Sequence, residues 1–296
     1  MEYISYTDLT RDIRNNISKI PKDVDGVIGI PRSGMLPATI IAEYLNVGLT
    51  TLLNFVEKYK DEIENGYKAI FNEHGNRRLN NNSYKKILVV DDTCFNGKSI
   101  LTTKKLLTKY KNVEFVYLVV YFEGSGTLSK PDVYLKDVRD LASKSEIGIV
   151  LYEWNLLSNP GIVSKTLFDL DGVFCVDPPD ERNTEQYIEY LNNPIPLFVP
   201  SKNEMITILT YRLIKYKDVT IEFLKKLGLK RIKLLMFQAE TYEERSKVEP
   251  WLFKGSYYKS NNDYKLFVES DDLQARMINK ISGKPVFCVS TNIMYK

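Results

Sequence analysis

Residues 89–99 read VVDDTCFNGKS, an apolar strand followed by two adjacent acids and a short polar loop that ends on Gly-Lys-Ser. The run 87–90 predicts a buried strand, and Asp91 and Asp92 follow at its carboxyl end, where side chains become exposed. Beyond the loop, apolar residues recur with helical spacing at Ile100, Leu101, Leu106, Leu107 and Tyr110. The stretch therefore predicts a strand, a loop and the start of a helix.

This loop has the composition of an anion site. Free backbone N–H groups at a helix start bind anions, and Thr93 and Ser99 add hydroxyl donors. Gly97 lets the backbone come close to a phosphate. The two carboxylates can accept hydrogen bonds from ribose hydroxyls or hold Mg²⁺ through water. The stretch predicts a site for a phosphorylated ribose, and an ordinary surface loop is the weaker interpretation.

The segment resembles the binding signature of type I phosphoribosyltransferases, which bind phosphoribosyl pyrophosphate (PRPP) with Mg²⁺ and displace its pyrophosphate. Upstream, a second apolar run, 24–30, leads into Pro31-Arg32-Ser33-Gly34, which is similar to the pyrophosphate loop of that family. Arg32 can clamp a diphosphate with its planar fork. The resemblance implies these PRPP-binding residues: Arg32, Ser33, Gly34, Arg77, Arg78, Asp91, Asp92, Thr93, Asn96, Gly97, Lys98 and Ser99.

Two neighbouring segments complete the first half of the chain. The helix after Gly34 is predicted to place Leu36, Ile40, Tyr44 and Leu45 on one face. The polar stretch 53–84 corresponds to a loop that closes over PRPP in the family. It contains Arg77 and Arg78, and a solvated loop with incidental arginines is an equally good interpretation. His74, the only histidine, has no required role.

Composition narrows the class of protein. The 296 residues carry 41 basic and 38 acidic side chains, so no global basic field attracts nucleic acid. No apolar run approaches the ~20 residues that span a bilayer, and the N-terminus is polar. The three cysteines are far apart and lack metal-ligand spacing. We expect a reduced cytoplasmic protein, with at most peripheral association with the inner face of the membrane.

The second half opens on another strand that ends in acids. Residues 166–173 read TLFDLDGV, and Asp169 and Asp171 are separated by one residue. A calcium loop fits poorly because further spaced ligands are missing. The segment resembles the first motif of the haloacid dehalogenase superfamily, whose members are mostly phosphatases. The resemblance implies that Asp169 attacks phosphorus and that Asp171 protonates the leaving oxygen.

Later segments resemble the remaining motifs of that superfamily in the correct order. A strand over 206–209 ends at Thr210, with Arg212 just beyond, and Lys254 matches the motif lysine, with Lys259 as the alternative. The strand 266–268 leads into Glu269 and Asp271. The resemblance implies catalytic Asp169, Asp171, Thr210 and Lys254, phosphate-binding Thr210, Arg212 and Lys254, and Mg²⁺-binding Asp169, Asp171, Glu269 and Asp271.

We therefore expect two three-layer α/β domains, each with a mostly parallel sheet and ligands at the carboxyl ends of the strands. The first, 1–158, has the type I phosphoribosyltransferase fold. The second, 159–296, has a haloacid dehalogenase-like Rossmannoid fold. Its cap is minimal, because the intervals between the motifs leave little beyond 177–200 for one.

Essentially the whole chain resembles bifunctional ribofuranosyltransferases of bacterial capsule and O-antigen polysaccharide biosynthesis. The resemblance implies transfer of ribose 5-phosphate from PRPP to a glycan hydroxyl, free or lipid-linked, with a β-ribofuranosyl product, and then removal of the 5-phosphate. No general base is identified, Glu57 and Asp61 being only the nearest candidates. A homodimer is one expected form.

Two alternatives stay open. One is a pyrimidine-type nucleobase phosphoribosyltransferase fused to a nucleotide phosphatase. Purine enzymes of the family carry an acid where this chain has Phe95, which speaks against purines. The other is a regulator with a degenerate PRPP site, which the intact Asp91, Asp92, Thr93 and Ser99 set disfavours.

Overall fold

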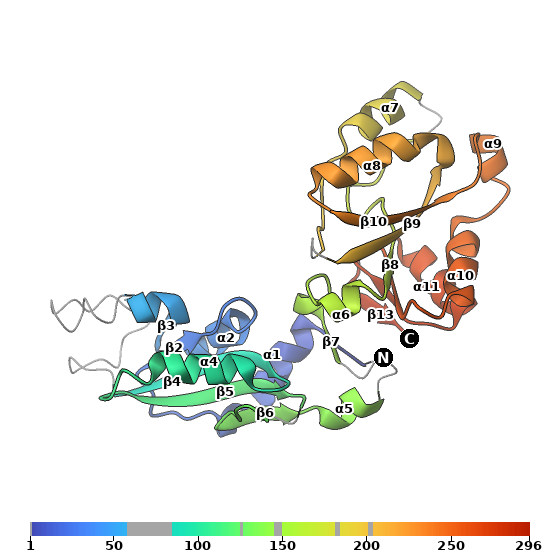
Figure 1. Cartoon of the computed structure of the whole chain (residues 1–296). Helices are drawn as coiled ribbons and strands as arrows, with labels where there is room; N and C mark the ends of the chain where they lie inside the picture. The colour runs from blue at the N-terminus through green and yellow to red at the C-terminus, as the bar shows by residue number, and fades with distance from the viewer. Residues whose placement is uncertain (1, 58–84, 125–126, 145–149, 181–183, 201–203) are drawn as a thin grey trace. The chain divides into compact units, whose positions relative to one another are not determined.

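The structure is a computed structural model that describes residues 2–57, 85–124, 127–144, 150–180, 184–200 and 204–296. The chain divides into two compact units (Figure 1), an N-terminal unit, Glu2–Trp154, and a C-terminal unit, Asn155–Lys296. Each unit is an α/β structure with its own sheet and hydrophobic core.

The N-terminal unit is built on a five-stranded sheet in the order β3-β2-β4-β5-β6, and every neighbouring pair is parallel. Its strands are β2 (Gly26–Gly29), β3 (Gly48–Thr51), β4 (Lys86–Cys94), β5 (Glu114–Phe122) and β6 (Val133–Asp137). All four residues of β2 are buried, and so are most residues of β4 and β5. Strands this apolar are expected in a parallel sheet covered on both faces.

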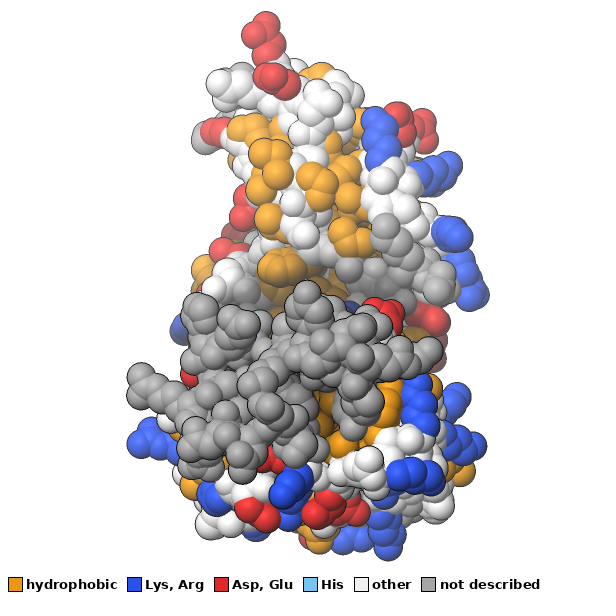
Figure 2. Space-filling view, turned by 90° about the vertical axis from the view of Figure 1, so that its left-hand side faces the viewer, with side chains coloured by type: hydrophobic (Ala, Val, Ile, Leu, Met, Phe, Trp, Pro, Cys, Tyr) orange, Lys and Arg blue, Asp and Glu red, His pale blue; other side chains and the backbone are white. Residues whose placement is uncertain are grey.

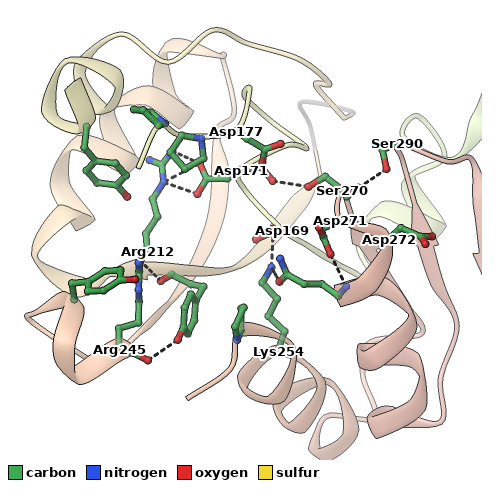
Figure 3. Close-up of a pocket in the computed structure, with 17 residues that line it drawn as sticks. Asp169, Asp171, Asp177, Arg212, Arg245, Lys254, Ser270, Asp271, Asp272 and Ser290 are labelled. Carbon is green, nitrogen blue, oxygen red and sulfur yellow. Dashed lines mark hydrogen bonds and ion pairs between the residues drawn. The ribbon is translucent and has the colours of Figure 1, made fainter. Parts of the chain in front are cut away.

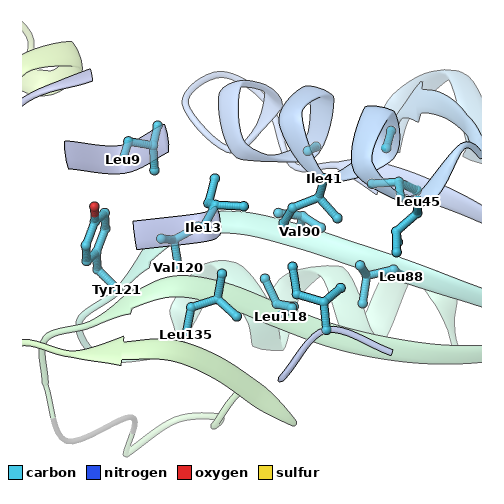
Figure 4. Packing of buried hydrophobic residues seen from close by; sticks show 14 of the residues in the cluster. Leu9, Ile13, Ile41, Leu45, Leu88, Val90, Leu118, Val120, Tyr121 and Leu135 are labelled. Carbon is cyan, nitrogen blue, oxygen red and sulfur yellow. The ribbon is translucent and has the colours of Figure 1, made fainter. Parts of the chain in front are cut away.

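Helices cover both faces of this sheet. On one face, α1 (Tyr6–Asn15) and α2 (Met35–Leu45) pack Leu9, Ile13 and Ile41 against strand residues such as Val90 and Leu118 (Figure 4). On the other face, α4 (Lys98–Leu107) contributes Ile100 and Leu107 to a second cluster. The three-layer arrangement predicted for this half is therefore confirmed.

The predicted apolar face of α2 is correct for Leu45, which is buried, and for Ile40, which packs against the core, but wrong for Leu36 and Tyr44. Leu36 and Tyr44 are 37% and 48% exposed, whereas Ala38, Ile41 and Ala42 are buried. The face of α2 that packs on the sheet is formed by Ala38, Ile41, Ala42 and Leu45, so Leu36 and Tyr44 lie away from it.

A small parallel sheet joins the two ends of the N-terminal unit. It pairs β1 (Glu2–Ile4) with β7 (Val150–Tyr152). Ser5 caps α1 in a reciprocal capping box with Asp8, which fixes the direction of the chain after β1. The short elements of this unit are the 3-10 turn η1 (Ile17–Lys19), helix α5 (Arg139–Lys144) and η3 (Glu153–Asn155), which ends in the next unit.

The C-terminal unit has a six-stranded sheet in the order β10-β9-β8-β11-β12-β13, parallel except for β13. Its strands are β8 (Thr166–Phe168), β9 (Met205–Leu213), β10 (Arg231–Phe237), β11 (Leu266–Glu269), β12 (Val286–Cys288) and β13 (Ile293–Tyr295). The predicted strands at 166–168, 206–209 and 266–268 all occur within these bounds.

Helices α10 (Pro250–Ser260) and α11 (Asp272–Ser282) pack against this sheet through Tyr258, Ala275 and Ile278. Helix α7 (Thr184–Asn192) contacts α8 (Lys217–Lys226), and both lie on the other side of β9 and β10 (Figure 1). The remaining short elements are α6 (Pro160–Val163), η4 (Ile214–Tyr216) and α9 (Tyr242–Arg245).

Hydrophobic side chains also gather on one outer face of the C-terminal unit (Figure 2). Several large exposed ones come from the segment that follows β8, namely Ile188, Ile195, Leu197, Phe198 and Val199. Among the described residues, no helix has the length and apolar character to cross a membrane.

Candidate functional site

Asp91 and Asp92 lie inside a strand and are buried. We expected the strand to end before them, but β4 continues to Cys94, and the two acids are only 7% and 3% exposed. The neighbouring strand β5 extends equally far and pairs with β4 up to Phe122, which explains the longer strand. The acidic pair is therefore part of the rigid sheet.

The surroundings of Asp91 hold its side chain in one orientation. The Ser99 hydroxyl donates to its Oδ2 at 2.8 Å, and the N–H of Asp92 donates to its Oδ1 at 3.0 Å. Burial raises the pKa of Asp91 well above its usual value, and the charge of Asp92 raises it further. A ligand that donates hydrogen bonds or carries positive charge stabilises the ionised form of such a carboxyl group most.

The two predicted PRPP motifs meet in space. Gly34 ends the loop after β2, and a Cβ at this position would lie 2.8 Å from Oδ1 of Asp91. Only glycine therefore allows the approach of the loop to the acid. Arg32 is exposed, Ser33 is half-buried, and the peptide bond between Pro31 and Arg32 is cis. The sequence-predicted association of the two motifs is present in the structure.

The loop between β4 and α4 is tightly packed at Gly97. Gly97 is the N-cap of α4 with a φ of 80°, and a Cβ there would lie 1.8 Å from the backbone oxygen of Ser129. Position 97 requires glycine because its backbone is left-handed and because Ser129 packs directly against it. Oδ1 of Asn96 accepts a hydrogen bond from the N–H of Lys98 at 3.0 Å. Both of these residues are exposed, and Thr93 is half-buried.

Sequence reasoning missed Trp154, whose indole Nε1 donates to Oδ2 of Asp92 at 2.6 Å. Trp154 belongs to an aromatic cluster, with ring centroids 5.1 Å from Tyr152, 6.3 Å from Tyr121 and 5.8 Å from Tyr6. The cluster links the small β1-β7 sheet to the acidic pair. Tyr6 is more than a hundred positions from Tyr121, Tyr152 and Trp154 in the sequence, so no local sequence pattern indicates the cluster.

Some predicted residues lie outside the described part of the chain. Arg77, Arg78, His74 and Asp61 all fall within 58–84. Glu57 is described, at the end of the helical residues 52–57, and it is exposed.

The C-terminal unit contains a pocket of about 480 Å³ at the carboxyl end of its sheet (Figure 3). It is lined by Asp169, Asp171, Asp177, Pro178, Pro179, Tyr187, Tyr211, Arg212, Tyr242, Arg245, Pro250, Lys254, Ser270, Asp271, Asp272, Gln274 and Ser290. Five of the sequence-predicted residues, Asp169, Asp171, Arg212, Lys254 and Asp271, are among them.

Lys254 is the centre of a buried charge cluster. Its Nζ lies 2.8 Å from Oδ2 of Asp169, 2.8 Å from Oε2 of Glu269 and 2.9 Å from Oε1 of Gln274. Burial disfavours the ammonium charge, but the two carboxylates outweigh it and raise the pKa of Lys254. Burial also raises the pKa of Asp169, as does Glu269, while Lys254 opposes both effects. Asp169 and Lys254, both singled out from the sequence, thus form an ion pair in the structure.

Asp171 is held by Arg212. Nε of Arg212 donates to both carboxylate oxygens, at 3.2 and 3.0 Å, and Nη2 donates to Oδ1 at 2.5 Å. The hydroxyl of Tyr190 donates to the same Oδ1 at 2.7 Å. Burial favours the protonated acid, but Arg212 outweighs it, so the pKa of Asp171 is lowered. Arg212 was predicted to bind phosphate, whereas its donors here serve the side chains around it.

Thr210 does not line the pocket. It is 1% exposed, and its Oγ1 accepts a hydrogen bond from the N–H of Arg212 at 3.2 Å. The register of β9 explains this, because Met236 pairs with Thr210 but the next residue, Phe237, pairs with Leu213. The extra residues, Tyr211 and Arg212, form a bulge that turns their side chains into the pocket.

The four predicted Mg²⁺ ligands do not form a metal cluster. Within the described ranges, no group of three or more His, Cys, Asp or Glu side chains is arranged to hold a metal ion. Glu269 is fully buried, with Oε1 accepting from the N–H groups of Ser270 and Asp271. Asp271 lines the pocket, but its Oδ1 caps α11 by accepting from the N–H of Gln274. These arrangements do not fit a metal ion held by all four side chains.

One wall of the pocket is aromatic and was not predicted. The Arg245 guanidinium lies 4.8 Å from the ring centre of Tyr211 and 5.5 Å from that of Tyr242. The Tyr211 hydroxyl donates to the backbone oxygen of Arg245 at 2.6 Å, which ties β9 to α9. Residues Asp177 to Pro179 and Tyr187 contribute to the lining from the segment after β8. Aromatic rings beside an arginine are suited to stacking on a sugar or another ring.

The N-terminal fold and site define a class of protein, a parallel α/β sheet with two loops that meet beside Asp91 at its carboxyl edge. The family model of the phosphoribosyl transferase domain matches residues 3–155, and the chain therefore belongs to that family. The type I phosphoribosyltransferase fold predicted for the N-terminal half, and PRPP as its substrate, agree with this membership.

Several solved structures are similar to the chain. A Helicobacter pylori xanthine-guanine-hypoxanthine phosphoribosyltransferase is 15% identical over 52% of this chain and 92% of its own, with a TM-score of 0.35. A Pyrococcus horikoshii purine phosphoribosyltransferase is 18% identical (52% and 95%, TM-score 0.35), and an Aeropyrum pernix orotate phosphoribosyltransferase 15% identical (47% and 74%, TM-score 0.33). These similarities carry no argument about the acceptor. A search of curated proteins finds no match.

Proposed function

We propose that the chain is a bifunctional ribofuranosyltransferase of capsule or O-antigen polysaccharide biosynthesis. The N-terminal unit transfers ribose 5-phosphate from PRPP to a glycan hydroxyl, giving a β-ribofuranoside. The C-terminal unit, a haloacid dehalogenase-like phosphatase, then hydrolyses the 5-phosphate. The observation that carries the proposal is the presence of charged pockets or loops at the carboxyl edges of two parallel sheets in one chain.

In the transferase, different groups of residues around Asp91 bind different parts of PRPP. Arg32, Ser33 and the start of α2 hold the pyrophosphate, and the loop from Thr93 to Ser99 holds the 5-phosphate. The carboxylates of Asp91 and Asp92 accept hydrogen bonds from the ribose hydroxyls. Mg²⁺ belongs to this proposal as the partner of the pyrophosphate. Preorganised groups of this kind stabilise charge as the anomeric bond breaks.

In the phosphatase, Asp169 attacks phosphorus, and Lys254 beside it offsets the negative charge of nucleophile and phosphate. Arg212 keeps Asp171 as a carboxylate. This state suits Asp171 for accepting a proton from the water that hydrolyses the aspartyl phosphate, whereas donation to the leaving oxygen requires its protonation first. The wall of Tyr211, Tyr242 and Arg245 offers the leaving sugar a stacking surface. The predicted Mg²⁺ ligands do not cluster within the described residues, so these steps use the side chains of the chain alone.

The test uses the full chain with PRPP, Mg²⁺ and a synthetic N-acetylhexosamine glycan, followed by product mass. We expect the glycan to gain a ribose and the solution to gain pyrophosphate and phosphate. Free nucleobases are supplied in parallel reactions. Ribosylation of a nucleobase with an unchanged glycan would replace the proposal by a salvage enzyme, and PRPP binding without turnover would indicate a regulator.

A further inference from the structure

Glu123 lies at the carboxyl edge of the N-terminal sheet, directly after β5. Its N–H donates to the backbone oxygen of Cys94 at 3.0 Å, so it is next to the end of the strand that carries Asp91 and Asp92. The chain is tightly packed there, since a Cβ on Gly124 would lie 2.0 Å from the backbone oxygen of Phe95. Its side chain is half-buried and therefore still accessible. The position is fixed by the backbone of two adjacent strands.

The environment of this carboxyl group favours proton exchange at neutral pH. Burial raises the pKa of Glu123 to about 7, the Tyr152 hydroxyl opposes the rise, and the charge of Asp92 adds to it. The titratable groups that face it are thus Tyr152 of β7 and Asp92 of β4. A base with a pKa near the working pH is best suited to remove a proton in a transition state.

Glu123 also lies at the same edge of the sheet as the proposed ribose site, because Cys94, which accepts its N–H, follows Asp92 by two residues in β4. Asp92, which we propose to bind a ribose hydroxyl, is near enough for its charge to act on Glu123. A ribose hydroxyl held by Asp92 belongs to the same five-membered ring as the anomeric carbon, so a group beside Asp92 lies near the bond that is exchanged. Trp154 and Tyr152 bound the same region, 5.1 Å apart. By contrast, the sequence-based candidate Glu57 is exposed at the end of a helix.

We propose that Glu123 is the general base that takes the proton from the acceptor hydroxyl during transfer from PRPP. The acceptor O–H bond breaks and its proton moves to the Glu123 carboxylate. The acceptor oxygen forms the new bond to the anomeric carbon, and pyrophosphate leaves with the electron pair of the old bond. This inference rests on the proposed transferase function and adds a catalytic residue to it.

The experiment measures pyrophosphate release by the full chain and by Glu123→Gln, with Glu123→Asp as the conservative variant. Glu114→Gln, at the exposed amino end of the same strand, is the matched control. Each protein is assayed with PRPP and glycan, and with PRPP alone, where water replaces the acceptor. The rate is recorded between pH 5 and 9, and PRPP binding is measured separately.

We expect Glu123→Gln to lower kcat by about 10²–10⁴-fold while KM for PRPP and PRPP binding stay unchanged. The wild-type rate should fall as the pH drops below about 7. This fall in rate at acidic pH should be absent in Glu123→Gln. It should persist in Glu123→Asp, which should keep partial activity. Wild-type kinetics in Glu123→Gln would overturn the inference while leaving the transferase function intact. If the wild type transfers nothing to glycan, the proposed function fails, and the water reaction of Glu123→Gln still decides the role of Glu123.

Discussion

Arg212 and Asp171 form a forked ion pair in which the arginine side chain is only 1% exposed. Breaking a buried pair by removing one partner leaves the other charge without compensation. Arg212→Met should therefore reduce the free energy of unfolding by about 3–5 kcal/mol, measured by urea denaturation. Arg231→Met, at an exposed end of β10, is the control. A loss of stability no larger than that of the control would contradict a structural role for the pair.

Asp169→Asn should uncouple the two proposed reactions. The amide cannot act as the nucleophile, so phosphate release should stop while pyrophosphate release continues in the other unit. Mass spectrometry should then show a product that retains the 5-phosphate. Asp263→Asn, an exposed acid before β11, should behave as the wild type. Continued phosphate release from Asp169→Asn would remove Asp169 from the proposed mechanism.

Trp154→Phe should weaken PRPP binding by about 10–150-fold, because a hydrogen bond to a charged group is worth roughly 1.5–3 kcal/mol. The phenyl ring keeps much of the aromatic packing but cannot donate to Asp92. The dissociation constant for PRPP is measured by calorimetry. Trp251→Phe changes the other tryptophan, which lies in α10, and should leave PRPP affinity unaltered. Equal affinity in the two variants would show that the indole N–H does not position Asp92 for the ligand.

Glu123→Gln should also change how stability depends on pH. The pKa of Glu123 in the folded protein, about 7, lies above its ordinary value of 4.5, so protonation favours the fold. This contribution is fully present below the ordinary value and is lost as the pH rises to about 7. The Tm of the variant, relative to that of the wild type, should therefore be higher at pH 8 than at pH 4.5. A difference in Tm that stays constant with pH would exclude the raised pKa.

Chelation should separate catalysis from folding. Removal of Mg²⁺ with EDTA is expected to stop pyrophosphate release, and added Mg²⁺ should restore it. The Tm should not change, because the described residues contain no cluster of metal-ligating acids on which the fold depends. Undiminished pyrophosphate release in EDTA would rule out Mg²⁺ as a cofactor of the transferase.

Local sequence patterns were sufficient to locate most strands and the loops after them. Apolar runs before Asp91 and Asp169 predicted β4 and β8, and the resemblance in motif order selected Lys254, which pairs with Asp169 in the structure. The spacing of apolar residues was less informative about which helix side chains are exposed. Leu36 and Tyr44 are exposed because Ala38, Ile41, Ala42 and Leu45 form the contact face of α2. Periodicity alone does not show which side of an apolar helix meets the sheet.

The sequence by itself determined the parallel α/β fold of the N-terminal unit and the membership in the phosphoribosyl transferase family, because both depend on short motifs at strand ends. Only the tertiary structure decided which side chains surround those motifs. The bulge in β9 places Tyr211 and Arg212 in the pocket in place of Thr210. Trp154 and Glu123 approach Asp92 through strand pairing across the sheets. Contacts of this kind depend on register and packing between segments distant in the chain, and no local pattern encodes them.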